Sequence, residues 1–158
     1  MKKTIHFDSF AREGWPQPSE LQRFFLAPQG REWSYRGGND HWGIDVDGLF
    51  GTDGLPDHER VSVSLSMVGN PDLGVSLFYS KWDGRVRRKF SYNSKGDFER
   101  VGEVVRSLQG DLWPVAFFVP FAVAWSAVRE FMETDGELPT SIEWIASEEL
   151  LSGTFPDP

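Results

Sequence analysis

Residues 120–145 read PFAVAWSAVREFMETDGELPTSIEWI, a pattern that predicts one amphipathic helix followed by a short strand. Pro120 suits the first helical position, where its fixed φ and missing N–H cost nothing. Gly136 and Pro139 predict the end of the helix, because glycine tolerates a left-handed cap and proline cannot continue the hydrogen-bond ladder. Ile142 and Trp144 alternate with polar residues, as in a half-buried strand. The helical spacing gathers apolar side chains on one face, namely Phe121, Ala124, Trp125, Val128, Phe131 and Met132.

Alternating apolar and polar residues predict several strands before this helix. The clearest strand covers residues 61–67, where every second residue is serine, and the turn residues at 69–72 lead from it into a strand over 74–80. Asp83-Gly84 fits a tight hairpin turn into a strand over 85–92. The remaining predicted elements are a short helix opened by Pro18 and ended by Pro28-Gln29-Gly30, a strand through Trp33 and Tyr35, a strand over 41–46, a loop over 47–56 and an apolar connector over 113–119.

The composition is that of a folded protein. The chain has 158 residues, of which 39% are hydrophobic and 15% aromatic, enough to build a core. We find no repeats and no linker, so we predict one α+β domain over residues 1–158, with a frayed tail over 152–158. Its expected architecture is a mostly antiparallel sheet with the long C-terminal amphipathic helix and a short N-terminal helix packed on it.

Location and covalent chemistry follow from what the sequence lacks. No apolar run approaches the roughly 18 residues of a membrane span, and the N-terminus has no apolar segment of a secretory signal. The chain contains no cysteine, which excludes disulfides, a thiolate nucleophile and cysteine-ligated metals. We therefore expect a cytoplasmic protein that does not bind membranes.

The balance of acidic and basic residues indicates which class of molecule the protein can bind. Acidic residues outnumber Lys and Arg 24 to 16, for a formal net charge of −8, which disfavours direct binding to nucleic acid. A basic protein partner would be attracted instead, although acidity also serves solubility alone. The one basic patch, Arg85, Arg87, Arg88 and Lys89, is interpreted as a partner for the acidic loops or as a guard of an edge strand.

The C-terminal half resembles immunity protein family 1 of bacterial polymorphic toxin systems. After Val119-Pro120 the matching pattern is A-x-x-A-V-R-E-F-x-E-T-x-G-E-L-P-T-x-x-E-W, from Ala124 to Trp144, and LGVSLFYSKWDG at 73–84 resembles the strand and turn that precede it in such proteins. The resemblance implies an inhibitor used in interbacterial competition, which binds a cognate toxin domain and occludes its active site without being an enzyme and without a cofactor. Partners in the family include toxins that attack nucleic acid, deaminases among them, so the expected partner is a basic, nucleic-acid-modifying toxin.

The same resemblance bears on the segment 98–108. Phe98, Val101, Val105 and Leu108 have helical spacing, whereas the resemblance implies a strand near residues 103–108. We favour the strand.

The candidate contact residues form an acidic belt on a glycine-rich, accessible loop. The belt comprises Asp40, Asp45, Asp47, Asp53, Asp57 and Glu59, offset nearby only by Arg60 and histidines. Carboxylates can occupy a basic nucleic-acid cleft by pairing with its Arg and Lys side chains.

The tryptophans divide into core and surface candidates. Four of them fall at the apolar positions of predicted helices and strands, as core residues do, namely Trp33, Trp42, Trp125 and Trp144. Trp15, Trp82 and Trp113 lie near turns, where an indole can anchor an interface. The predicted toxin-binding residues are Asp45, Asp47, Asp53, Asp57, Glu59, Trp82 and Trp15, and a merely solvated loop stays open as the alternative.

Two other classes of function remain open from the sequence. A small enzyme would need a site around His41, His58 and Asp53, and a regulatory binding module unrelated to toxins would need no toxin at all. A metal site is not expected, because Leu49, Phe50 and Pro56 stand where an EF-hand loop after Asp45 needs ligands and glycine. The G-x-S-x-G turn of serine hydrolases is absent as well.

Overall fold

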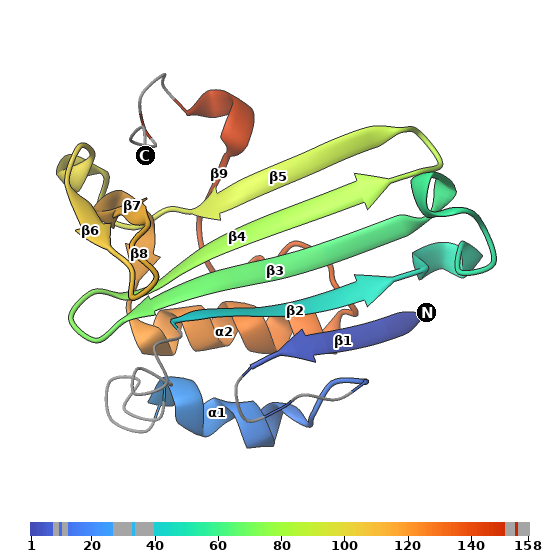
Figure 1. Ribbon diagram of the computed structural model, residues 1–158, viewed down its shortest axis with the longest axis horizontal. Helices are drawn as coiled ribbons and strands as arrows, with labels where there is room; N and C mark the ends of the chain where they lie inside the picture. The colour runs from blue at the N-terminus through green and yellow to red at the C-terminus, as the bar shows by residue number, and fades with distance from the viewer. Residues whose placement is uncertain (8–9, 11–12, 27–32, 34–39, 151–153, 155–158) are drawn as a thin grey trace.

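The computed structural model describes residues 1–7, 10, 13–26, 33, 40–150 and 154. Within this part of the chain, antiparallel strands form one sheet in the order β1-β2-β3-β4-β5-β9, and β8 adds to β4 (Figure 1). β6 and β7 form a separate two-stranded sheet. This arrangement confirms the predicted α+β class. The elements are β1 (Lys2–His6), α1 (Pro18–Leu26), β2 (His41–Asp47), β3 (Val61–Asn70), β4 (Gly74–Asp83), β5 (Arg88–Ser94), β6 (Val104–Arg106), β7 (Leu112–Pro114), β8 (Phe118–Val119), α2 (Phe121–Glu133) and β9 (Trp144–Ala146).

Helix α2 packs its apolar face against one side of the large sheet, with α1 beside it (Figure 1). The predicted stripe is confirmed, because Phe121, Ala124, Trp125, Val128, Phe131 and Met132 are all buried, together with Ala127. The two helices meet where Phe25 lies 5.4 Å from Trp125. On the sheet side, Ile44, Leu65 and Leu77 are fully buried beneath them.

An aromatic cluster fills the space between α1 and the sheet. The indoles of Trp33 and Trp42 stack with their ring centroids 4.2 Å apart, and the ring centroid of Phe7 lies 3.9 Å from that of Trp42. Gly69 lies against this stack, since a Cβ there would come within 2.5 Å of the Trp33 ring. The predicted core positions of Trp33, Trp42 and Trp125 are confirmed, whereas Trp144 is only partly buried.

The end of α2 is closed by backbone and tyrosine hydrogen bonds. The helix stops at Glu133, and the N–H of Gly136 donates to the carbonyl of Phe131 at 2.9 Å. Gly136 has φ +99°, which glycine adopts without strain, and its carbonyl accepts from the Tyr79 hydroxyl at 2.7 Å. Gly136 therefore ends the helix as predicted and ties it to β4.

The carboxylate of Glu130 holds the segment that follows. It accepts hydrogen bonds from the Thr140 N–H, the Thr140 hydroxyl and the Ser141 N–H at 2.7–3.0 Å. Because these N–H groups are taken by a side chain, the strand predicted through Ile142 begins only at Trp144. The donors stabilise the ionised carboxylate and lower the pKa of Glu130 to about 2.

The hairpin between β4 and β5 differs from the prediction. Asp83 pairs with Arg88, so the connection is a loop over residues 84–87 and β5 starts three residues later than expected. The buried Asp83 carboxylate accepts from the Arg85 backbone N–H at 3.1 Å and from its guanidinium at 2.9 and 2.8 Å. These bonds stabilise the longer loop in place of a two-residue turn.

Several short elements were missed or only partly predicted. Strand β1 was not expected, because Ile5 is the one apolar residue in it and no alternation of apolar and polar residues can be seen. Residues 98–100 form a 3-10 turn and β6 follows, which confirms the preference for a strand in this segment. The predicted connector over 113–119 contains the end of β7, a 3-10 turn and β8.

Three predictions fall wholly or largely outside the described residues. These are the end of the first helix at Pro28-Gln29-Gly30, the strand through Trp33 and Tyr35, and the frayed tail over 152–158. Among the described residues, none of the helices combines the length and apolar character required to cross a membrane.

We expect Glu130→Gln to lower the free energy of unfolding at pH 7 by about 1–2 kcal/mol, because the backbone donors lose a charged acceptor that is partly exposed to solvent. The pKa of Glu130 is lower in the folded protein, so its contribution is complete above its usual value of 4.5 and is lost as the pH falls towards 2. Urea unfolding of both proteins at pH 7 and pH 3 measures this difference.

The control is Glu133→Gln, whose carboxylate lies 3.7 Å from Arg129 on the exposed side of α2 and should contribute little. An equal loss for Glu130→Gln at both pH values would contradict the assignment.

Candidate functional site: the open face of the sheet

Within the described part of the chain, no helix covers the face of the sheet opposite α1 and α2, although Val68, Ser76 and Asn93 at its β6–β7 end are buried. Alternation along each strand turns Ile44, Val46 and Leu65 towards the helices and their neighbours to the other side. We call this second surface the open face. Its side chains are those of Lys2, Thr4, His6, His41, Asp45, Asp47, Ser62, Ser64, Ser66, Val68, Ser76, Phe78, Ser80, Trp82, Lys89, Ser91 and Asn93, with Gly43 among them.

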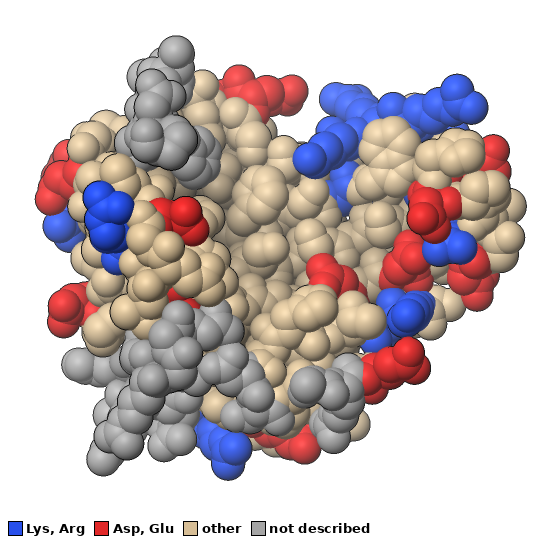
Figure 2. All heavy atoms as spheres, viewed as in Figure 1, with Lys and Arg blue, Asp and Glu red and all other residues tan. Residues whose placement is uncertain are grey.

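A groove of about 520 Å³ crosses the open face. The groove runs across the strands, along residues that are paired with one another in the sheet. Gly43 is paired with His6 on one side and with Ser66 on the other, and Ser66 is paired with Phe78. Figure 2 shows this region as a hollow formed almost entirely by uncharged residues. The groove exists because Gly43 has no side chain and the serines have short ones.

One end of the groove is closed by the β6–β7 sheet. The rings of His41 and Trp113 lie 5.6 Å apart, and both residues line the groove. Asp40 holds this arrangement, since its carboxylate bonds His41 Nδ1 at 2.8 Å and accepts from the Leu108 N–H at 2.7 Å. Asp40 is only 3% exposed, so the expectation that it belongs to an accessible acidic belt was wrong.

The neighbouring row of the open face carries hydroxyl groups around one carboxylate. Thr4, Asp45, Ser64, Ser80 and Ser91 are successive register partners across five strands. Partial burial raises the pKa of Asp45 above its usual range, and His6, whose Nε2 lies 3.3 Å away, opposes this shift. The ionised form of Asp45 is thus disfavoured in the free protein, and a partner cation would stabilise it.

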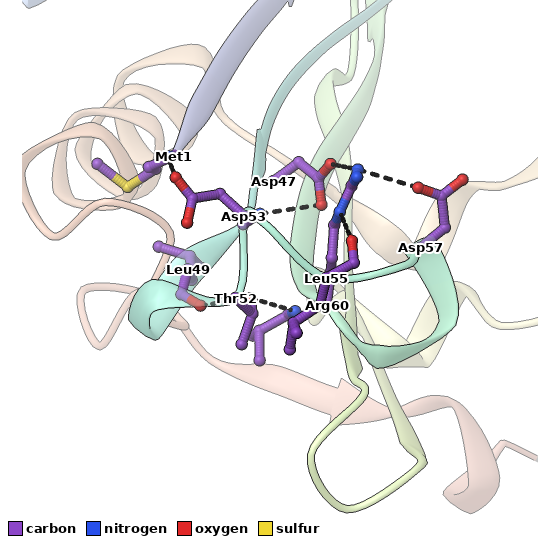
Figure 3. Close-up of polar contacts among 10 residues, drawn as sticks. Met1, Asp47, Leu49, Thr52, Asp53, Leu55, Asp57 and Arg60 are labelled. Carbon is purple, nitrogen blue, oxygen red and sulfur yellow. Dashed lines mark hydrogen bonds and ion pairs between the residues drawn. The ribbon is translucent and has the colours of Figure 1, made fainter.

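The other acidic residues are partly neutralised within the protein. The Arg60 guanidinium lies between the carboxylates of Asp47, at 3.1 Å, and Asp57, at 2.9 Å (Figure 3). Asp53 pairs with the N-terminal ammonium at 3.0 Å, which lowers the pKa of its carboxyl group. Arg60 therefore offsets more of the acidic belt than the sequence suggested.

The structure brings together some of the predicted contact residues. Asp45, Asp47 and Trp82 share the open face, and Trp82 is held there because its Nε1 donates to the His58 carbonyl at 3.1 Å. Asp53 and Asp57 (Figure 3) lie in the connection between β2 and β3, at the end of this face, and Glu59 belongs to the same connection.

Trp15 lies elsewhere, at the β1 edge. Its Nε1 donates to the carbonyls of Thr4 and Asp45, both at 3.0 Å, and its ring lies 5.7 Å from Phe131 of α2. These contacts hold the segment after β1 against the helix layer.

The alternative enzyme site is not assembled. His41 pairs with Val68 near the end of β3, whereas His58 precedes Val61 at its start, so about 20 Å of strand separates them. Their carboxylate neighbours also differ, since His41 bonds Asp40 and His58 lies 3.8 Å from Glu59. Among the described residues, no group of three or more His, Asp and Glu side chains is placed to hold a metal ion.

Sequence reasoning missed the groove, although part of its signal was present. The serine alternation over 61–67 already predicts a polar face, but Gly43, Phe78 and Asn93 meet only through the register of four strands. Nothing in the local pattern of these residues distinguishes them from turn or core positions.

Comparison with known proteins identifies the family to which the chain belongs. No curated protein and no solved structure matches this chain. The family model described as immunity protein Imm1 matches residues 7–146, which include β2–β9, both helices and the whole groove except His6. The match spans nearly the full chain, and the protein belongs to the Imm1 family of immunity proteins.

Proposed function

We propose that this protein neutralises its cognate toxin by placing the open face over the active site of the toxin domain, without catalysing a reaction itself. Membership in the Imm1 family carries the immunity role and the existence of a toxin partner. The surface is our inference, and it rests on the face of the sheet without a helical layer and on its groove of about 520 Å³.

The chemistry of the open face suits a protein partner. Serine and threonine side chains lose little conformational entropy when a partner covers them, and their hydroxyl groups can both donate and accept hydrogen bonds. Phe78 and Trp82 stand two rows apart on β4 and are half-buried, as expected of aromatic anchors at an interface. The groove between His6 and Asn93 can receive a side chain of the toxin.

The acidic residues favour a basic partner, and we propose a nucleic-acid-modifying toxin such as a deaminase. Asp45 and Asp47 on β2, with Asp53, Asp57 and Glu59 beside them, would pair with the Arg and Lys side chains that grip phosphates. The net charge of −8 speeds association with such a toxin. Inhibition would take place in the cytoplasm, where the nucleic acid substrate is found.

Co-expression tests the immunity role. We expect the polypeptide encoded by the neighbouring upstream gene to arrest growth, and this protein to restore growth and to co-purify with it. Failure of both rescue and co-purification would remove the toxin from the proposal and favour a regulatory binding module.

Gly43→Val tests the groove. A Cβ at this position meets only the Leu65 carbonyl, at 3.6 Å, so the added side chain fills the groove without disturbing β2. We expect the free energy of unfolding to rise by about 1 kcal/mol, because glycine weakens a strand interior, and toxin affinity to fall at least about tenfold. Thermal unfolding and isothermal titration measure the two effects.

The control for Gly43→Val is Ala122→Val, which also creates a valine, by adding two methyl groups on the exposed surface of α2, and should leave affinity unchanged. Full affinity of Gly43→Val would exclude the groove from the interface.

Asp45→Asn separates stability from binding. Because burial raises the pKa of Asp45, ionisation costs stability above the folded-state pKa, and this cost disappears as the pH falls below it. We expect Asp45→Asn to be more stable than wild type at pH 7 and equal to it at low pH, while it binds the toxin more weakly. Calorimetry at pH 7 and pH 3 and titration at pH 7 provide the measurements, and unchanged affinity would place Asp45 outside the contact.

A further inference from the structure

The outer edge of β5 is only half occupied. Strand β9 pairs with residues 92–94 alone, because the chain leaves the ladder at Ser147 and turns into a 3-10 helix over Ser147–Glu149. Figure 1 shows β9 beside one end of β5 only. A notch of about 80 Å³ between residues 88–92 and Ala146 marks the point where the ladder stops. Within the described chain, residues 88–91 therefore have no strand on their outer side.

The unused edge presents backbone hydrogen-bonding groups. The Lys95 N–H donates to the Glu143 carbonyl at 3.0 Å, which fixes Lys95 as a residue whose peptide groups face β9. Such residues alternate along an antiparallel strand, so Asn93, Ser91 and Lys89 turn their N–H and C=O groups the same way. Asn93 is paired by β9, and the pair Tyr92–Ala146 places the Ser91 carbonyl opposite the Ser147 N–H, so the edge groups beyond the last β9 pair are the Ser91 N–H and the N–H and C=O of Lys89.

The same edge is strongly basic and its loop is held in one conformation. Arg87, Arg88 and Lys89 are exposed and form no ion pair with any described residue. Figure 2 shows Lys and Arg side chains gathered at this end of the molecule. The loop before β5 is ordered by the bidentate pair of Arg85 with Asp83, at 2.9 and 2.8 Å, and carries the exposed Val86 at its tip.

We propose that an acidic extended segment of the cognate toxin adds to the sheet as a strand beside β5, in the place that β9 leaves empty. Backbone hydrogen bonds to Ser91 and Lys89 supply the pairing, as in other strand additions. The charges of Arg87, Arg88 and Lys89 select an acidic segment and oppose a second copy of this chain, whose β5 edge is equally basic. This inference rests on the proposed toxin-binding function and adds a contact beside the open face.

Hydrogen exchange tests the strand addition directly. In the free protein the amides of Lys89 and Ser91 should exchange rapidly, and in the purified complex they should be protected at least about tenfold. Protection of the open face without protection of these two amides would overturn the strand addition and leave the proposed function intact. If the toxin formed no complex with the wild-type protein, both the strand addition and the proposed function would be wrong.

Ser91→Pro provides an independent measurement. Proline removes the outward N–H and leaves the β4 side of the strand unchanged, which edge positions tolerate. We expect toxin affinity to fall about tenfold relative to Ser91→Ala, the matched control, which keeps the N–H. Equal affinities of the two variants, both folded by circular dichroism, would contradict the inference.

Charge reversal tests the chemistry of the occupant. We expect Arg88→Glu/Lys89→Glu to speed dissociation of the toxin complex about tenfold, because like charges then face the acidic segment. An unchanged dissociation rate would exclude an acidic segment. A concentration-dependent dimer of the wild-type protein, lost in Ser91→Pro, would instead identify a second copy of this chain as the occupant.

Discussion

The packing of α2 against a single face of the sheet is the constraint from which the rest of the structure follows. The apolar stripe of the helix must be buried, and the strand residues that face it, such as Leu65 and Leu77, form the continuous apolar surface that receives it. The alternate residues, Ser62, Ser64 and Ser66, could not bury a second helical layer because they are small and polar. One-sided burial therefore leaves the other face of the sheet without a helical layer, and it is this face that we propose as the contact with the partner.

The residues that carry the family resemblance mostly hold the helix layer together. Glu130 binds the backbone at Thr140 and Ser141, Gly136 ends α2 and accepts from Tyr79, and the Trp144 indole donates to the Pro139 carbonyl at 2.8 Å. All of these contacts lie at the end of α2 and on the loop behind it. These contacts of the C-terminal pattern therefore report the fold rather than the toxin contact.

The net charge conceals a division within the surface. Acidic side chains gather between β2 and β3, where Arg60 already pairs with Asp47 and Asp57, while the β4–β5 loop and the start of β5 are basic. Trp82 lies between these two regions, because its register partners are Ser62 on β3 and Lys89 on β5. A partner that matches this surface needs both a basic and an acidic region, which is more specific than attraction to an acidic protein.

The sequence by itself determined the helix over residues 121–133, its end near Gly136, the strands around the serine alternation and the aromatic core, because each of these depends on neighbours within one turn or one strand. It also placed Asp45, Asp47 and Trp82 among the candidate contacts. Only the tertiary structure decided that Asp40 is buried, that Arg60 neutralises two aspartates and that β9 stops short along β5. The groove at Gly43 was decided in the same way. These features arise from strand register and from contacts between residues far apart in the chain, which local periodicity does not encode.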